Sequence, residues 1–247
     1  MNKVFLALKQ SFKSCFDPRI LFLLFTPFFL ALIIGLILFF TLGTWWITQL
    51  SSGVESSYLM QYVAQKWDYF GEGGAGSVSY FLALVVTLLV LIPLSYWAAV
   101  LVVSLILLPF ILKILERTNY PGLEKKHGGN FAFSLWNTLK VSVLYILGLV
   151  LSLPLWFFPG FALALPILLS AYLNKNLFVY DVLEDYATDE ERTQLEKENR
   201  SSLYLLGILL GFINYIPLAF VVAPTFASLA YSHFCLNALK ELRQNKP

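Results

Sequence analysis

Four long stretches without a charged side chain dominate the pattern of hydrophobic and polar positions along this chain. About 20 consecutive apolar residues can span a bilayer core of about 30 Å, and each stretch is longer than that. The pattern therefore predicts an all-α integral membrane protein, with a single membrane domain over residues 1–247. The four stretches are residues 20–54, 73–112, 141–174 and 201–239, with His233 counted as neutral.

The first two stretches predict two long transmembrane helices, over residues 20–46 and 78–118. Arg19 precedes the first helix and Trp45-Trp46 closes it, in the positions of interfacial anchors. The second stretch is longer than a bilayer core even when the helix is tilted. We therefore expect its helix to continue past the lipid as far as Thr118.

Residues 1–19 form an amphipathic segment. Its apolar residues recur at helical spacing, and its lysines lie largely away from that stripe. The pattern is typical of a short helix lying in the membrane interface, and it is equally compatible with a plain cytoplasmic start to the first span. The apolar positions are Phe5, Leu8, Phe12 and Phe16, and the basic ones are Lys3, Lys9 and Lys13.

Prolines interrupt the third and fourth stretches, which predicts two helical hairpins. A turn at residues 154–160 leaves arms of about 13 and 14 residues, or about 20 Å each at 1.5 Å per residue. A turn at residues 217–224 leaves arms of about 22 to 24 Å. Neither pair crosses about 30 Å of hydrocarbon. We therefore predict partly penetrating hairpins: hairpin 1 over residues 141–174, and a cytoplasmic helix running into hairpin 2 over residues 188–239.

Lysine and arginine are distributed unevenly, and their distribution predicts the topology. Of the 17 Lys and Arg residues, only Lys66 lies between the first two spans. The positive-inside rule then places residues 47–77 outside and every other charged segment, with both termini, in the cytoplasm. Both hairpins must begin and end on the cytoplasmic side. Two pairs of helices that cross the membrane fully would also begin and end in the cytoplasm, but the short arms favour partial penetration.

Two polar segments carry local signals. Thr188 followed by Glu191 predicts a helix start with a capping box, and Glu196 and Arg200 are spaced to pair on a helix surface. Pro121-Gly122 predicts a turn before the third stretch. We interpret residues 175–200, which contain the capping box, as a solvated helix leading into the fourth stretch, with no strong indication of a site.

Composition and chemistry narrow the function. The chain is 58% hydrophobic and 13% charged, against about a quarter charged in soluble domains. No nucleophile motif or phosphate loop is present, so we expect no enzyme and no cofactor. His233 and Cys235 lie on different faces of a helix, which argues against a metal site. No Asp, Glu, Lys or Arg lies inside the four stretches, which disfavours a proton-coupled pump.

Broken helices within a membrane indicate a transport site, because their ends expose backbone dipoles. The second arm of each hairpin begins near the apex, where its free N–H groups favour an anion. The first arm ends at the same apex and partly cancels that field, so hairpins that merely pack a bundle remain an alternative. Arg19 is a second candidate, either as an oxyanion ligand or as a snorkelling anchor.

The chain resembles the CysZ-type sulfate permeases, which are related to the etoposide-induced protein 2.4 family. The resemblance rests on "DPRILFLLFTPF", "LILLPFILKILE", "LWFFPGFALALPILLSAYL", "YDVLEDYA" and "YIPLAFVVAPTFASLAY", whose order and spacing cover nearly the whole chain. It implies two long helices, two partly penetrating hairpins, and a homo-oligomer in the bacterial inner membrane. It also implies sulfate uptake for cysteine synthesis.

The same resemblance implies one site residue. In that family a Gly-Leu/Ile-Arg motif before the first span is associated with sulfate binding, and the matching residues here are Asp17-Pro18-Arg19-Ile20. Only Arg19 carries over, as a substrate-binding residue. We expect a permease for sulfate or a similar oxyanion, with the lipid bilayer as surroundings and no nucleic-acid partner. The alternative is a non-transporting membrane scaffold or assembly protein.

Overall fold

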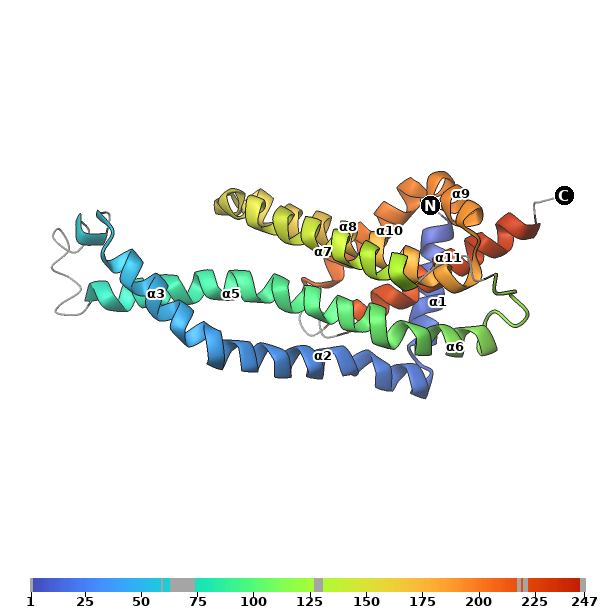
Figure 1. Ribbon diagram of the computed structural model, residues 1–247, viewed down its shortest axis with the longest axis horizontal. Coiled ribbons are helices and arrows are strands. Elements are labelled where there is room, and N and C mark those ends of the chain that lie inside the picture. The colour runs from blue at the N-terminus through green and yellow to red at the C-terminus, as the bar shows by residue number, and fades with distance from the viewer. Residues whose placement is uncertain are drawn as a thin grey trace. The chain divides into compact units, whose positions relative to one another are not determined.

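All the elements in the described part of the chain are helices. The computed structural model describes residues 2–58, 60–62, 74–126, 131–216, 219 and 222–244. Within these residues, three helices are long and apolar enough to cross a membrane: Ser77–Thr118, Ala132–Phe157 and Gly160–Tyr186. The predicted class, an all-α integral membrane protein, is confirmed (Figure 1).

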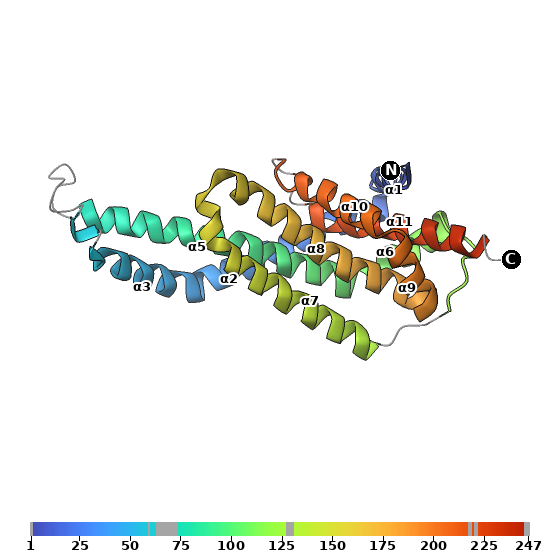
Figure 2. The same ribbon diagram turned by 90° about the horizontal axis from the view of Figure 1, so that it is seen from above.

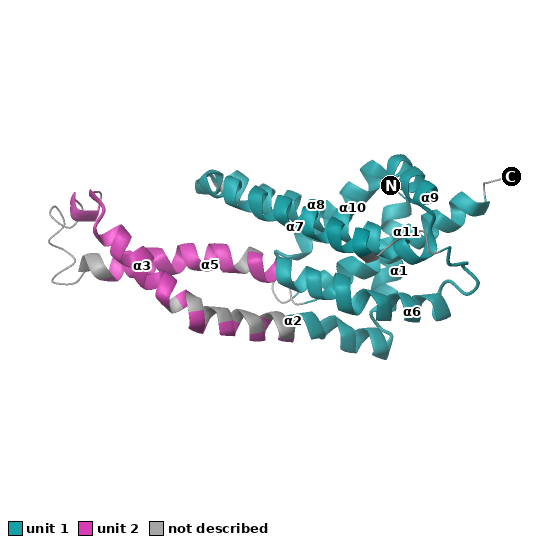
Figure 3. Ribbon diagram, in the orientation of Figure 1, with its two compact units in different colours: residues 1–28, 97–247 teal, residues 29–96 magenta. Residues whose placement is uncertain are grey.

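The helices form two compact units (Figure 3). Unit 1 contains residues 1–28 and 97–247, and unit 2 contains residues 29–96. The chain passes from one unit to the other inside two helices, α2 (Pro18–Leu38) and α5 (Gly74–Val102). The sequence predicts a single domain. It gives no sign of the division into two units, because both boundaries between the units lie within continuous helices.

Each of the two long helices predicted from the sequence contains a π-helical turn. After α2 the chain continues through η1 (Phe39–Gly43) into α3 (Thr44–Glu55), so helix extends beyond the predicted 20–46. After α5 it continues through η3 (Val103–Leu107) into α6 (Leu108–Thr118). Pro109 follows η3 and has no N–H to offer an earlier carbonyl, and a wider turn accommodates that loss. The predicted helix 78–118 is helical to Thr118.

Hairpin 1 consists of α7 (Phe131–Ser152), the short 3₁₀ turn η4 (Leu153–Phe157) and α8 (Pro159–Tyr186). Phe158 is extended and Pro159 starts α8, so the chain turns within the predicted 154–160. The two helices run side by side in opposite directions (Figure 2). They have 22 and 28 residues, about 33 and 42 Å, because both extend beyond the charge-free stretch. Partial penetration stays a prediction.

The last part of the chain contains α9 (Asp189–Glu198), α10 (Arg200–Ile213) and α11 (Ala223–Gln244). The predicted capping box is confirmed, since Thr188 accepts from the Glu191 N–H and Glu191 accepts from the Thr188 N–H. Glu196 pairs with Lys175 of α8 at 2.8 Å, rather than with the predicted Arg200. Half of the predicted apex at 217–224, namely residues 217, 218, 220 and 221, lies outside the described residues.

The core of unit 1 surrounds α11, whose residues are buried along most of its length. It packs against α8, α10 and the N-terminal helix α1 (Asn2–Ser14). Helix α10 lies very close to α8, because Gly207 and Gly211 leave room for it. A Cβ at Gly207 would lie 3.0 Å from Ala171 Cα, and one at Gly211 would lie 2.9 Å from Ile167 Cγ2. This spacing of small residues lets membrane helices approach closely.

Candidate functional site: a charged pocket at one end of unit 1

Helix α6 has an apolar face and a charged face. Its apolar residues Leu108, Ile111, Leu112 and Leu115 are buried in unit 1. On the other face, Lys113 and Arg117 are exposed and four residues apart, so they lie on neighbouring turns. The packing of one face therefore fixes the direction in which the two cations project.

A pocket of about 410 Å³ lies along this charged face. Its volume is within the range of about 300–1,000 Å³ typical of small-molecule sites. Three cations and two carboxylates line it, which leaves a formal charge of +1 (3 − 2). The lining residues are Pro109, Leu112, Lys113, Glu116, Arg117, Lys125, Asp185 and Tyr186.

One of the three cations is neutralised within the pocket. Lys125 Nζ lies 2.8 Å from Glu116 Oε2, and the Tyr186 hydroxyl donates to the same oxygen at 3.2 Å. Within the described residues, the structure records no hydrogen bond or ion pair for the side chains of Lys113 and Arg117. These two cations are therefore the ones available to an incoming anion, and a guanidinium can bind an oxyanion in bidentate fashion.

The wall of the pocket is fixed from outside by Arg243 of α11. Its Nη1 donates to the Glu124 carbonyl at 2.8 Å, next to Lys125, and its Nη2 donates to the Tyr186 carbonyl at 2.5 Å. The same guanidinium donates to both carboxylate oxygens of Glu191, at 3.2 and 3.0 Å. Arg243 thus joins α8, α9 and the segment after α6 at a single point.

Glu191 is the carboxylate that binds Arg243 and keeps it in this position. Its side chain is only 3% exposed, and Lys126 Nζ lies 3.0 Å from Oε1. Burial by itself would raise the pKa of Glu191, but hydrogen bonds from Arg243, Lys126 and the Thr188 N–H lower it to about 2. Glu191 therefore remains ionised at every physiological pH.

A second polar link ties the helices together near the pocket. Asp181 of α8 accepts hydrogen bonds from Ser104 in η3 and, at 3.0 Å, from Ser134 in α7. The π-helical turn thus contacts hairpin 1 through Asp181, in addition to the contact between α6 and α8 through Glu116 and Tyr186. This link holds the two arms of hairpin 1 and the helix that carries the pocket cations in one arrangement.

Arg19 is not among the residues that line the pocket, and within the described residues no recorded hydrogen bond includes its side chain. Its guanidinium is exposed, and its backbone N–H donates to Asp17 Oδ1 at 2.9 Å. Asp17 therefore acts as the N-cap of α2, with Pro18 at the first helical position. The carboxylate of Asp17 occupies an N–H group that a bound anion could otherwise use.

The second arms of the two hairpins differ at their N-termini. The start of α8 has no side-chain cap, and Phe157 and Phe158 beside it are 90% and 61% exposed. The start of α11 is buried, and the Thr225 hydroxyl there has no recorded partner. Among the described residues, no recorded contact joins Arg19 to the N-terminus of α8 or to that of α11.

His233 of α11 has a packing environment rather than ligand geometry. Its Nδ1 lies 2.8 Å from the Tyr120 hydroxyl, and its Nε2 lies 2.9 Å from Ser14 Oγ. Across the described ranges, no three His, Cys, Asp or Glu side chains are grouped so that they could hold a metal ion.

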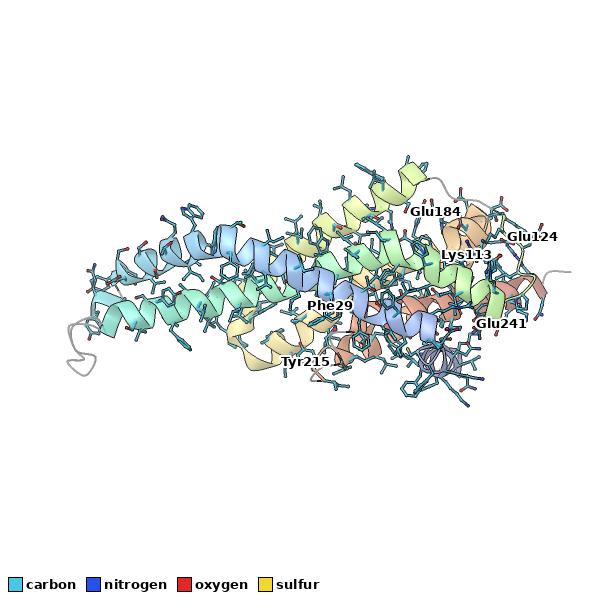
Figure 4. The ribbon with its side chains drawn as sticks, turned by 90° about the horizontal axis from the view of Figure 1, so that it is seen from below. Phe29, Lys113, Glu124, Glu184, Tyr215 and Glu241 are labelled. Atoms are coloured by element: carbon cyan, nitrogen blue, oxygen red, sulfur yellow. The ribbon has the colours of Figure 1, made fainter. Side chains whose placement is uncertain are left out.

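The residues of the pocket were not predicted as a site from the sequence. Lys113 and Arg117, four apart at the end of a long apolar helix, were the available signal. Figure 4 shows the labelled Lys113, Glu124, Glu184 and Glu241 gathered at one end of unit 1, with Tyr215 away from them. The charged groups of the unit therefore collect where the apolar helices end.

Comparison with known proteins gives one match. A family model described as "Sulfate transporter CysZ/Etoposide-induced protein 2.4" matches residues 7–224, which include the pocket, hairpin 1 and most of hairpin 2. No curated protein and no solved structure matches the chain.

Proposed function

The chain belongs to the sulfate transporter CysZ/etoposide-induced protein 2.4 family, and we propose that it is a permease or channel for a small oxyanion, with sulfate as its substrate. In this proposal it resides in the bacterial inner membrane as a homo-oligomer, with both termini in the cytoplasm. It supplies sulfate for cysteine synthesis, without enzymatic activity and without nucleotide hydrolysis.

The observation that carries the proposal is the pocket with Lys113 and Arg117 at the end of a membrane helix. A charged cleft attracts ions of the opposite sign and raises their local concentration, which speeds their entry into a pathway. A divalent oxyanion such as sulfate interacts with two neighbouring cations more strongly than chloride does. The pocket would therefore serve as the cytoplasmic mouth of the path, and Glu116 would keep Lys125 from binding the anion too tightly.

Arg19 has a separate role in the proposal. Because Asp17 already accepts from the Arg19 N–H, an anion there would be bound by the guanidinium alone. We assign Arg19 to a position of lower affinity on the cytoplasmic side of the path. Calorimetry of sulfate binding to purified Arg19→Ala should show weaker binding, and unchanged affinity would leave Arg19 as a membrane anchor.

The proposal is tested by uptake of radiolabelled sulfate into liposomes that contain the purified protein. We expect uptake above empty vesicles, and a large reduction in the Lys113→Gln/Arg117→Gln double variant. The matched control is Lys197→Gln/Lys240→Gln, which removes two exposed charges outside the pocket. An absence of uptake under all ionic conditions would favour a non-transporting scaffold, and an equal reduction in both double variants would remove the pocket from the path.

A further inference from the structure

Helix α1 presents three different faces along its length. The first face is buried against α11 through Val4, Ala7 and Ser11, all fully buried. At 100° per residue, Phe5 and Phe12 lie more than 100° from this face. Phe16 lies in the turn after α1, and its ring centroid is 5.3 Å from that of Phe12. We call these three residues the aromatic stripe. The stripe is exposed: Phe5 is 57%, Phe12 63% and Phe16 72% accessible. Lys9 and Lys13 lie beside it, on the third face.

The buried face fixes the orientation of the other two. Lys3 pairs with Glu241 at 2.6 Å, Gln10 Oε1 accepts from Asn237 at 2.6 Å, and Ser14 meets His233. In these pairs the residue numbers increase along α1 while those of the partners on α11 decrease. The two helices are therefore antiparallel and joined at several points. Helix α1 therefore cannot rotate to bury its aromatic residues without breaking these links.

The charges on the third face decide what the aromatic face meets. Lys9 and Lys13 are exposed, and within the described residues neither has a recorded ion pair. Helix α1 ends at Ser14, and α2 begins at Pro18 after a turn, so the stripe lies directly beside the entry of the chain into the membrane. Aromatic residues flanked by lysines at this position fit a bilayer surface with negatively charged headgroups.

We propose that the outward side of α1, together with the turn that follows it, is a binding surface for anionic phospholipids, in which Phe5, Phe12 and Phe16 enter the acyl boundary and Lys9 and Lys13 contact the headgroups. The buried side stays docked on α11. Lipid binding therefore attaches the helix that contacts His233 and Glu241 to the membrane surface. This inference does not depend on the identity of the transported substrate.

The test uses the full chain in vesicles, with Cys15 and Cys235 replaced by serine and a spin label at residue 12 or residue 6. Leu6 is an exposed control position about 120° away from Phe12 on the helix. In phosphatidylcholine vesicles that contain phosphatidylglycerol, we expect the label at residue 12 to be accessible to oxygen and shielded from a water-soluble nickel reagent. The label at residue 6 should be more accessible to nickel.

The lysines are tested in the same system. Lys9→Gln/Lys13→Gln should abolish the difference in label depth between vesicles with and without phosphatidylglycerol, and 0.5 M salt should weaken it. The control Lys197→Gln/Lys240→Gln should keep the difference. Nickel access to residue 12 in both kinds of vesicle would overturn the proposal. An equal effect of the two double variants, or close approach of labels from neighbouring protomers at residue 12, would also overturn it.

Discussion

Replacing Glu191 by glutamine should destabilise the protein by about 3 kcal/mol. The change keeps the shape of the side chain and removes the charge that Arg243 and Lys126 share. The pKa of Glu191 falls from its ordinary 4.5 to about 2, and a difference of this size corresponds to about 3 kcal/mol at pH 7. Removing one partner of a buried ion pair costs about 3–5 kcal/mol, which agrees with this value.

The pH dependence follows from the direction of the shift. Because the folded-state pKa is depressed, the stabilisation is fully present above about pH 5 and is lost as the pH falls towards 2. At pH 3 it should have fallen to about 1 kcal/mol by the same linkage relation. The difference between the parent protein and Glu191→Gln should therefore shrink by more than half between pH 7 and pH 3.

The measurement is reversible unfolding of the purified protein in mixed micelles, followed by tryptophan fluorescence at both pH values. Glu190→Gln is the matched control, since Glu190 is exposed in the same first turn of α9. Both variants lose a charge that interacts with the helix dipole, and only Glu191→Gln also loses the buried ion pairs. Equal losses for the two variants, or a Glu191→Gln difference that does not change with pH, would refute the reasoning.

Two further predictions concern helix packing and topology. Gly207→Ala should destabilise the protein by about 1–3 kcal/mol in the same unfolding assay, because its Cβ would lie 2.7 Å from Tyr231 Oη and 3.0 Å from Ala171 Cα. Gly53→Ala, which meets no atom within 4 Å, is the control and should not destabilise it. Phe157→Cys, in a Cys15→Ser/Cys235→Ser background, should resist a membrane-impermeant thiol reagent applied outside. Ready labelling would mean that hairpin 1 spans the membrane fully.

Local features of the fold follow from the sequence because their causes are local. The capping box depends only on Thr188 and Glu191, three residues apart. Similarly, Pro121-Gly122 forms its turn because Gly122 adopts φ of +84°, which glycine reaches without strain. The turn of hairpin 1 is set by Pro159 and the break before it. The helices exceed the predicted arms because their hydrogen bonds continue past the first charged residue.

The candidate site could not be derived in the same way, since its partners are distant in sequence. Glu191 and Arg243 are 52 residues apart, and nothing in the spacing of charges selects that pair. The predicted pairing of Glu196 with Arg200 shows the difficulty, because Glu196 pairs with Lys175, 21 residues earlier. Which of several surface charges meet depends on how α8, α9 and α11 pack.

The order of synthesis gives the pairing of α1 with α11 a further consequence. Gln10 and Asn237 are 227 residues apart, so at about 5–20 residues per second the ribosome needs roughly 10–45 s to make the partner of α1 after α1 itself. During that time Val4 and Ala7 have no helix to bury them. The membrane surface that we propose to bind the outward side of α1 is then the nearest apolar support for a nascent α1.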